Sequence, residues 1–331
     1  MLKDTFNGKR VLFIGVKFYD YHLEIKRKME EYGASVSFFS ERDTSIKYGI
    51  VNRLFHSKLD KYQELHYSSV LKKTDQIKFD YLFVIRGFKM PLSFVKTIKK
   101  KNPGIKCIMY QWDANTNSPF INLPEKHNVL PEFEKIFSFD FKDVEEHRFL
   151  KYSPTFHTDE FLKLANSNHQ KCTYDFFYFG SYLPERYAGL LKFREFAEAG
   201  GHKLKTHFYM SYRYYQIEKL KGTVLDKSVI NFKPMTRQEY LDLFMQSKAI
   251  VDVSNAKQTG LAMRVIDAIG AGKKVLTTNG WIVKEPSYNT KQIQIIDIDN
   301  ITIPEGFLEE KLEFLKPDYT IDHFLTIIFC N

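Results

Sequence analysis

One arginine and one aspartate interrupt an apolar, glycine-rich segment late in the chain, QTGLAMRVIDAIGAGKKVLTTN, residues 258–279. If residues 261–270 form a helix, Arg264 and Asp267 stand three residues apart on one face, while the rest of its girth is apolar. A buried arginine needs a partner, because an unpaired buried charge is strongly destabilising. The pattern therefore predicts either a mutual Arg264–Asp267 ion pair or a polar stripe that faces a bound ligand.

The ligand that suits this stripe is a nucleoside diphosphate. Arg264 lies near the start of the expected helix, just after Gly260, where free N–H groups and the helix dipole favour an anion such as phosphate. Asp267, one turn deeper, can accept a hydrogen bond from a ribose hydroxyl.

The elements that must position these side chains alternate between strands and helices, which predicts open, mostly parallel sheets. The expected strands are 9–15, 34–39, 80–85, 105–110, 135–139, 174–179, 207–210, 248–253, 274–277 and 294–298. The expected helices are 21–32, one that follows Pro91, 185–199, 236–246, 261–270 and 319–329. Thr236 followed by Glu239 forms a capping-box pattern at the start of one of them.

The alternation breaks at a polar stretch, YSPTFHTDEFLKLANSNHQKC, residues 152–172. We therefore expect an α/β domain at 1–152, a link at 153–173 and a second α/β domain at 174–318. The remaining residues, 319–331, form a C-terminal helix that is a candidate to pack back on the first domain. Open parallel sheets bind ligands beyond the carboxyl ends of their strands, so the side chains to watch directly follow strands.

The composition limits the compartment and the class of protein. The chain has 331 residues, of which 44% are hydrophobic and 16% aromatic, which argues against disorder. Cys107, Cys172 and Cys330 are far apart and form no CxxC pair, so we expect neither a disulfide framework nor a zinc site. The sequence shows no signal peptide and no apolar run long enough to span a membrane, so a cytoplasmic protein is expected.

The net charge of +9 bears on the partners. Such an excess favours nucleic acid, an anionic membrane face or phosphorylated small molecules. The densest basic cluster, Lys96 with Lys99, Lys100 and Lys101, fits either a solvated helix end or a patch in peripheral contact with an anionic membrane. No zinc-finger or RNP-type signature accompanies it, so nucleic acid is not expected as a partner.

Segment 258–279 resembles the donor-nucleotide element of GT-B glycosyltransferases, in which a glycine-rich turn opens a helix that ends in an acid and an A-x-G turn. Three further stretches support the resemblance: YQWDA at 110–114, KIFSFDFKD at 135–143 and YFGSYLPERY at 178–187. The chain is most similar to bacterial capsule, exopolysaccharide and lipopolysaccharide glycosyltransferases, over most of its length and most strongly over 174–298. The resemblance implies two Rossmann-like domains facing each other across a cleft.

The resemblance also implies roles for individual residues. Those implied to bind the donor nucleotide and its phosphates are Gly180, Ser181, Arg186, Gly260, Arg264 and Asp267. Those implied to contact the donor sugar or the acceptor are Trp112, Gln258, Thr259 and Asn279. The common family pattern has a glutamate at the position of Asp267 and another near Thr259, and this sequence has neither. Alternatives remain open, since Arg186 also fits a surface arginine at a helix start and Asn279 a plain turn.

A sugar transferase benefits from a general base near the acceptor hydroxyl. Asp113, directly after an expected strand and next to Trp112, is the first candidate, and Asp140, also at a strand end, is the second. Each also fits a capping aspartate, and Trp112 also fits a core residue. The sequence does not separate inversion from retention.

No DxD pair that could hold a metal–diphosphate directly follows a strand, and Asp297-Ile298-Asp299 reads as a strand-end loop. We therefore expect a metal-independent enzyme without a cofactor, in which Arg264 and helix N-termini offset the charge of the leaving diphosphate.

The expected function is transfer of a sugar from a nucleotide-sugar donor to a glycan or lipid-linked acceptor in bacterial surface polysaccharide synthesis, by a cytoplasmic enzyme at the inner face of the cell membrane. Rival functions are a nucleotide-sugar epimerase and a non-catalytic nucleotide-sugar- or glycan-binding subunit. A dinucleotide oxidoreductase is disfavoured because no GxGxxG follows the first strand.

Overall fold

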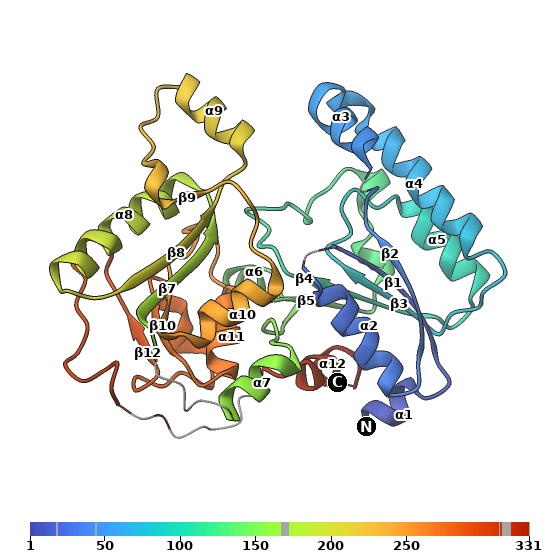
Figure 1. The fold of residues 1–331 in the computed structure, drawn as a ribbon. Coiled ribbons are helices and arrows are strands. Elements are labelled where there is room, and N and C mark those ends of the chain that lie inside the picture. The colour runs from blue at the N-terminus through green and yellow to red at the C-terminus, as the bar shows by residue number, and fades with distance from the viewer. Residues whose placement is uncertain (18, 44, 167–171, 311, 313–318, 331) are drawn as a thin grey trace. The chain divides into compact units, whose positions relative to one another are not determined.

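The chain folds into two α/β units. A computed structural model describes residues 1–17, 19–43, 45–166, 172–310, 312 and 319–330. The first unit comprises Met1–Pro154, Lys257–Gly260 and Ile321–Asn331, and the second comprises Thr155–Ala256 and Leu261–Thr320. Each unit contains one parallel sheet with helices against it (Figure 1).

The sheet of the first unit has the strand order β2-β1-β3-β4-β5-β6, and every strand pair in it is parallel. Its strands are β1 Arg10–Gly15, β2 Ser35–Ser40, β3 Tyr81–Ile85, β4 Lys106–Gln111, β5 Lys135–Ser138 and β6 Leu150–Tyr152. Its helices are α1 Leu2–Phe6, α2 Tyr21–Glu31, α3 Ile46–Leu54, α4 Leu59–Lys73, α5 Leu92–Lys101, α6 Phe141–Glu146 and α12 Ile321–Cys330.

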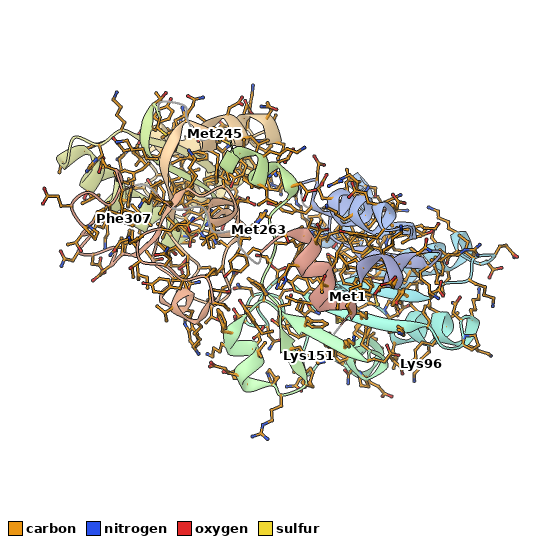
Figure 2. The ribbon with its side chains drawn as sticks, turned by 90° about the horizontal axis from the view of Figure 1, so that it is seen from below. Met1, Lys96, Lys151, Met245, Met263 and Phe307 are labelled. Carbon is orange, nitrogen blue, oxygen red and sulfur yellow. The ribbon has the colours of Figure 1, made fainter. Side chains whose placement is uncertain are left out.

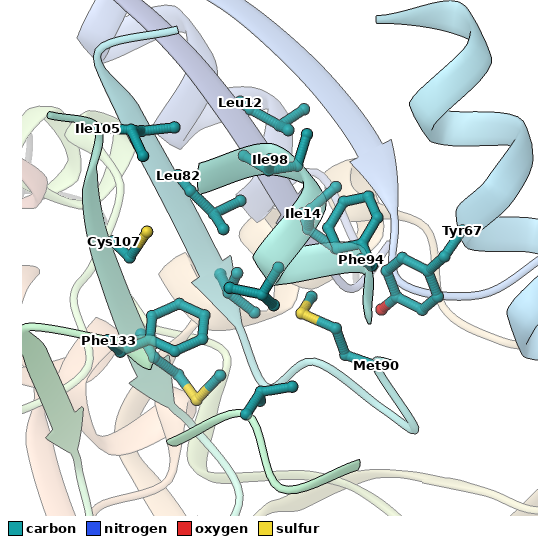
Figure 3. Close-up of a cluster of buried hydrophobic side chains, with 14 of the residues drawn as sticks. Leu12, Ile14, Tyr67, Leu82, Met90, Phe94, Ile98, Ile105, Cys107 and Phe133 are labelled. Atoms are coloured by element: carbon teal, nitrogen blue, oxygen red, sulfur yellow. The ribbon is translucent and has the colours of Figure 1, made fainter. Parts of the chain in front are cut away.

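The core of the first unit follows from the near-continuous apolar runs of β1, β3 and β4, which are buried on both faces as parallel strands require. On one face, side chains such as Leu12, Leu82 and Cys107 pack with Phe94 and Ile98 of α5 (Figure 3). Burial raises the pKa of the Cys107 thiol to about 12, so this cysteine behaves as an apolar core residue.

The two ends of the chain meet in the first unit. Phe329 of α12 packs edge-on against Phe6 of α1, with ring centroids 4.9 Å apart, and against Tyr81 of β3 at 5.4 Å. Tyr32, just after α2, donates a hydrogen bond to Asp322 of α12 at 3.1 Å. The helix expected at 319–331 therefore belongs to the first unit.

The sheet of the second unit has the order β12-β11-β10-β7-β8-β9, again with every pair parallel. Its strands are β7 Tyr174–Ser181, β8 Leu204–Tyr209, β9 Ile230–Asn231, β10 Ser247–Asp252, β11 Lys274–Thr277 and β12 Ile293–Ile295. Its helices are α7 Asp159–Asn166, α8 Pro184–Ala199, α9 Tyr212–Leu220, α10 Arg237–Met245 and α11 Met263–Gly270. Met245 and Met263 mark the end of α10 and the start of α11 in Figure 2.

Alternation along β7 divides the core of the second unit between the two faces of its sheet. Phe176 and Tyr178 pack in a cluster with Leu190 and Phe193 of α8. Phe177 packs in another cluster, with side chains of α10 and α11 such as Val265. The hydroxyl-bearing Tyr178 is therefore on the α8 side of the sheet.

The predicted α/β alternation is confirmed, with shifts at the element ends and with elements that the sequence analysis did not predict, among them α4, α9, β6 and β9. The strand expected at 207–210 runs Leu204–Tyr209, and the helix expected at 261–270 begins at Met263. The capping box of Thr236 and Glu239 is present at the start of α10. Residues 155–166 of the expected link form part of the second unit and include α7, whereas residues 167–171 lie outside the described part of the chain.

No helix among the described residues is both long and apolar enough to cross a membrane.

Candidate functional site

The chain reverses its direction of travel across the second sheet between β7 and β10. From β7 the chain moves outward through β8 to β9, then returns to the other side of β7 at β10 and continues to β11 and β12. Ligands of open parallel sheets bind beyond the carboxyl ends of the strands at such a reversal. The helices that follow these two strands, α8 and α11, carry in their first turns the two arginines singled out in the sequence, Arg186 and Arg264.

Arg264 is held by a buried carboxylate. Its side chain is 11% exposed and forms an ion pair with Asp252, the last residue of β10, which is 1% exposed. The other oxygen of Asp252 accepts a hydrogen bond from Thr277 at 2.8 Å. Burial alone would lower the pKa of Arg264, but Asp252 outweighs burial and the pKa is raised, so the guanidinium stays charged.

The mutual Arg264–Asp267 pair, one of the two alternatives from the sequence, is wrong. Asp267 is 1% exposed and accepts a hydrogen bond from the hydroxyl of Tyr240 at 3.2 Å. Asp267 is close enough in the helix to pair with Arg264, but the side chain of Arg264 extends instead to Asp252 at the end of β10. The ribose contact expected of Asp267 stays a prediction.

Arg186 brings a second positive charge to the same place without a carboxylate. No hydrogen bond or ion pair of Arg186 is found within the described residues, and its Nε atom is buried without a partner. Burial, and then the charge of Arg264, lower the pKa of Arg186. Arg186 is thus half-buried rather than fully exposed at the start of its helix. The Nε atom of Arg264 is also buried without a partner.

The hydroxyl of Tyr178 completes this cluster. It is buried without a hydrogen-bond partner, and burial raises the pKa of Tyr178 while the charges of Arg264 and Arg186 oppose the rise. Gly180, two residues along β7, leaves it room, because a Cβ there would lie 3.0 Å from that hydroxyl oxygen. Gly189 lets α8 approach β10 closely, since its Cβ would lie 2.7 Å from Val253. That approach brings Arg186, one turn earlier on α8, to the end of β10.

We refer to Arg186 and Arg264 as the arginine pair. It holds two positive charges against the single carboxylate of Asp252, and its two Nε atoms and the nearby hydroxyl of Tyr178 are three buried polar atoms left unpaired. Buried polar groups are rarely left unpaired, and a surplus positive charge at two helix N-termini favours an anion. The arrangement therefore suits a phosphate or diphosphate group.

The other residues expected near the donor in the second unit lie at strand ends. Gly180 and Ser181 lie beyond the strand expected at 174–179 but are the last two residues of β7, paired with Phe208 and Tyr209 of β8. Ser181 is exposed. Asn279 precedes the 3-10 helix Gly280–Lys284, and its side chain accepts a hydrogen bond from the backbone N–H of Trp281 at 3.0 Å.

In the first unit, three charged residues that follow strands of the sheet meet. Glu41 follows β2, Arg86 follows β3, and Asp113 lies two residues after β4. Arg86 pairs with Glu41, which is fully buried, and donates to Oδ2 of Asp113 at 3.1 Å. Burial opposes the charged form of Arg86, yet its hydrogen bonds to Glu41 and Asp113 raise its pKa.

Asp113, the first candidate base, is held in position by Arg86 and is accessible to solvent. Its side chain is 35% exposed, and its Oδ1 atom makes no hydrogen bond within the described residues. Arg86 has φ +68°, a left-handed conformation that is uncommon for a residue other than glycine, and its carbonyl accepts a hydrogen bond from Gln111. Trp112, between Gln111 and Asp113, is half-buried.

Asp140, the second candidate base, is 2% exposed and accepts five hydrogen bonds. The donors are Lys142 N at 3.1 Å, Asp143 N at 3.2 Å, Thr259 N at 2.6 Å, Thr259 Oγ1 at 2.7 Å and Gly260 N at 3.1 Å. The capping role that the sequence left open is thus present at the start of α6. The same carboxylate also anchors segment 257–260 to the first unit.

Three residues expected at the donor or its sugar lie in this anchored segment. The hydroxyl and the backbone N–H of Thr259 both donate hydrogen bonds to Asp140, and the N–H of Gly260 donates to the same carboxylate. A Cβ at Gly260 would lie 2.5 Å from the carbonyl oxygen of Phe139, so this position requires glycine. Gln258 contacts the carbonyl of Gly260 at 3.4 Å. The donor contacts expected of these residues stay predictions.

No group of three or more His, Cys, Asp or Glu side chains that could hold a metal ion is found within the described residues. Asp297 and Asp299 lie after β12, and Asp299 pairs with Lys192 of α8. This agrees with the strand-end loop expected from the sequence.

Comparisons with known proteins address the fold. No protein-family model and no curated protein sequence matches the chain. Among solved structures, a glycosyltransferase from Rickettsia africae matches with a TM-score of 0.50 and 11% identity over 88% of this chain and 85% of that chain. The chain has the GT-B fold.

Two other solved structures lie further from this chain. MurG of Acinetobacter baumannii matches with a TM-score of 0.45 and 10% identity over 89% of this chain and 87% of that chain. The lipopolysaccharide outer core galactosyltransferase WaaB matches with a TM-score of 0.43 and 10% identity over 81% of this chain and 80% of that chain.

Sequence reasoning missed Asp252, Tyr178, Glu41 and the role of Arg86. Asp252 is the lone acid of an apolar strand, KAIVDV, and such a carboxylate requires a cation, which was the available signal for its pairing with Arg264. Nothing in the sequence marks Tyr178 or Glu41, because their significance depends on which strands become neighbours.

Proposed function

We propose that the protein is a glycosyltransferase that binds a nucleotide-sugar donor on its second unit. The observation that carries the proposal is the arginine pair at the sheet reversal, with its surplus positive charge and its unpaired buried N–H groups. A donor diphosphate would receive hydrogen bonds from both guanidinium groups, and Asp252 would keep Arg264 in place. The GT-B fold, which the chain shares with the glycosyltransferase from Rickettsia africae, is consistent with this function.

In this reaction the leaving group is a nucleoside diphosphate, which departs with the electron pair of the bond to the sugar. We propose that Arg186 and Arg264 stabilise the charge that develops on it, as preorganised donors do in a water-poor site. The hydroxyl of Tyr178, near both guanidinium groups, is a further donor. Stabilisation of the leaving group by these side chains needs no metal ion and no cofactor, and we propose a metal-independent enzyme.

Asp113 is the proposed general base on the first unit. Arg86 holds one carboxylate oxygen and leaves the other open to an acceptor hydroxyl, whose proton it would take as the oxygen attacks the sugar. The proposed acceptor is a glycan or a lipid-linked sugar of a bacterial surface polysaccharide, and the proposed site of work is the cytoplasmic face of the cell membrane.

Calorimetric titration with UDP, GDP, CDP and their common sugar conjugates, with and without EDTA, tests the donor site. The proposal predicts saturable binding of one nucleoside diphosphate that EDTA does not change. Absence of binding by all of them would contradict it. Binding that EDTA abolishes would retain the donor site and contradict metal independence.

A non-catalytic binding subunit is the second candidate function. The observation that favours it is the engagement of Thr259 and Gly260 by Asp140, which leaves the segment expected to contact the donor sugar bound to a protein carboxylate. Donor binding without any transfer or hydrolysis of the sugar, over a panel of glycan and lipid-linked acceptors, would support this candidate.

A further inference from the structure

Helix α9 and the turn after it, residues 212–224, expose a cluster of apolar side chains on the second unit. Leu220 is 88% exposed and Val224 is 89% exposed, and Tyr212, Tyr214 and Ile217 are each more than a third exposed. In Figure 1, α9 projects away from the sheet of its unit beyond β8 and β9. Single exposed apolar residues are common on proteins, but a contiguous group marks an interaction surface.

The helix is anchored on one side only. Tyr215 and Glu218 are its buried residues, and the ring of Tyr215 packs edge-on against Phe232 at 5.2 Å. On the other side, Ile217 and Leu220 are three residues apart and share one face of α9, while Val224 follows the turn at Lys221 and Gly222 that ends the helix. The exposure of Ile217 and Leu220 thus follows from the helix geometry and from the buried tyrosine on the opposite side, and Val224 adds an exposed apolar side chain just after the helix.

Basic side chains surround these exposed apolar residues. The exposed basic residues of 212–227 are Arg213, Lys219, Lys221 and Lys227. The two acids of the segment are already engaged, since Glu218 accepts hydrogen bonds from Lys221 and Thr223, and Asp226 pairs with Arg194 of α8. Within the described residues, Arg213, Lys219 and Lys227 have no carboxylate partner.

The lysine cluster of α5 was the candidate for membrane contact in the sequence. It differs from residues 212–224 in the pairing of its charges and in the burial of its apolar side chains. Lys99 pairs with Glu132, and Lys101 pairs with Asp75, so two of its four charges are neutralised nearby. Its apolar residues Phe94, Val95 and Ile98 are buried in the core. Exposed apolar side chains and unpaired basic charges occur together on α9.

We propose that residues 212–224 bind the surface of an anionic lipid bilayer. Leu220 and Val224 enter the boundary between headgroups and acyl chains, and Tyr212 and Tyr214 lie at headgroup level, where amphipathic rings are favoured. Arg213 and Lys219 contact lipid phosphates, and each such charge contributes about fivefold to affinity at low salt. The net charge of +9 adds a general attraction to the same surface. This inference does not depend on the proposed enzymatic function.

Co-sedimentation of the full chain with lipid vesicles tests the inference. Vesicles of phosphatidylcholine alone are compared with vesicles containing phosphatidylglycerol, at low and high salt. The proposal predicts binding to the anionic vesicles that weakens with salt, at least about tenfold weaker binding by Leu220→Gln/Val224→Gln, and weaker binding by Arg213→Gln/Lys219→Gln. Leu65→Gln on α4, where the leucine is 63% exposed, and Lys72→Gln/Lys73→Gln are matched controls that should bind as the wild type does.

Three results would overturn the proposal. The first is no binding to anionic vesicles, and the second is binding that the α9 variants and the controls weaken equally. The third is concentration-dependent self-association in gel filtration that Leu220→Gln/Val224→Gln abolishes, which would assign the surface to a second copy of the chain. Thermal unfolding of each variant confirms that it is folded, and nucleoside diphosphate binding, measured in parallel, separates this result from the test of the donor site.

Discussion

Arg264 forms its ion pair with Asp252, which precedes it by 12 residues and ends the neighbouring strand β10. The pair connects the first turn of α11 to the end of the sheet, where the chain reverses direction. It fixes one guanidinium rigidly, while Arg186 approaches the same point from α8 with no carboxylate of its own. Because only Arg264 has a carboxylate partner, we expect Arg264 to contribute to stability and Arg186 to contribute mainly to ligand binding.

Replacement of Arg264 should destabilise the fold. Arg264→Met leaves the carboxylate of Asp252 buried without its partner, which should cost about 3–5 kcal/mol in the free energy of unfolding. Urea unfolding measures the loss. The double variant Arg264→Met/Asp252→Asn should recover most of it, because the unpaired charge is gone. A single variant as stable as the wild type would show that the pair carries no stability.

We expect Asp140 to stabilise the structure and Asp113 to contribute to the rate of turnover. Asp140→Asn removes the charge that five N–H and O–H donors share, so we expect a loss of about 2 kcal/mol or more and release of segment 257–260. Limited trypsin digestion detects the release as faster cleavage at the exposed Lys257. Asp113→Asn should show the wild-type cleavage rate but a strongly reduced kcat. Equal cleavage rates for wild type and Asp140→Asn would refute the anchoring role.

Gly270, the last residue of α11, should not tolerate alanine. A Cβ there would lie 2.4 Å from Cδ2 of His157, so Gly270→Ala should cost about 1–3 kcal/mol through overpacking. In a His157→Ala background the same change should cost less, and a double-mutant cycle measures the difference. Gly49→Ala, in α3 with no neighbouring atom within 4 Å, is the control and should be neutral or slightly stabilising. Additive effects of the two substitutions would contradict the contact.

The stability of the second unit should fall on mild acidification. Burial lowers the pKa of His157 below its ordinary value of 6.5, and the side chain is fully buried with Nε2 unpaired. Above pH 6.5 both folded and unfolded forms are neutral, and the full stability is present. Below it the unfolded form binds a proton that the folded form does not, so stability falls by at most about 1.4 kcal/mol per pH unit for this group.

Urea unfolding between pH 7.5 and 5.5 measures this slope. His207 is shifted in the same direction by burial and adds to it. His157→Gln should flatten the dependence, because glutamine does not titrate. An unchanged slope in that variant would assign the pH dependence to other groups.

Most strands and several helices followed from the sequence because apolar runs and periodicity are local properties, but α4, with 15 residues, was not predicted. The runs at β1, β3 and β10 bury both faces of a parallel strand, and a capping box marked α10. The site was predicted only in part. Arg264 was identified from its place in an apolar helix and Arg186 from the resemblance to GT-B glycosyltransferases, but Asp252, Tyr178 and Glu41 acquire their roles from strand order. The anchoring of segment 257–260 by Asp140, more than a hundred residues away, has no local signature.

The measurement that tests the arginine pair most directly is titration of Arg186→Met with the nucleoside diphosphate that the wild type binds, together with its thermal unfolding. Arg186 is repelled by Arg264 and has no carboxylate partner within the described residues, so its removal should leave the melting temperature unchanged or higher. Affinity for the diphosphate should fall about 10-fold or more, as loss of one charge-assisted contact of about 1.5–3 kcal/mol implies. Unchanged affinity, or a lower melting temperature, would show that Arg186 is a structural residue and would contradict the proposed donor site.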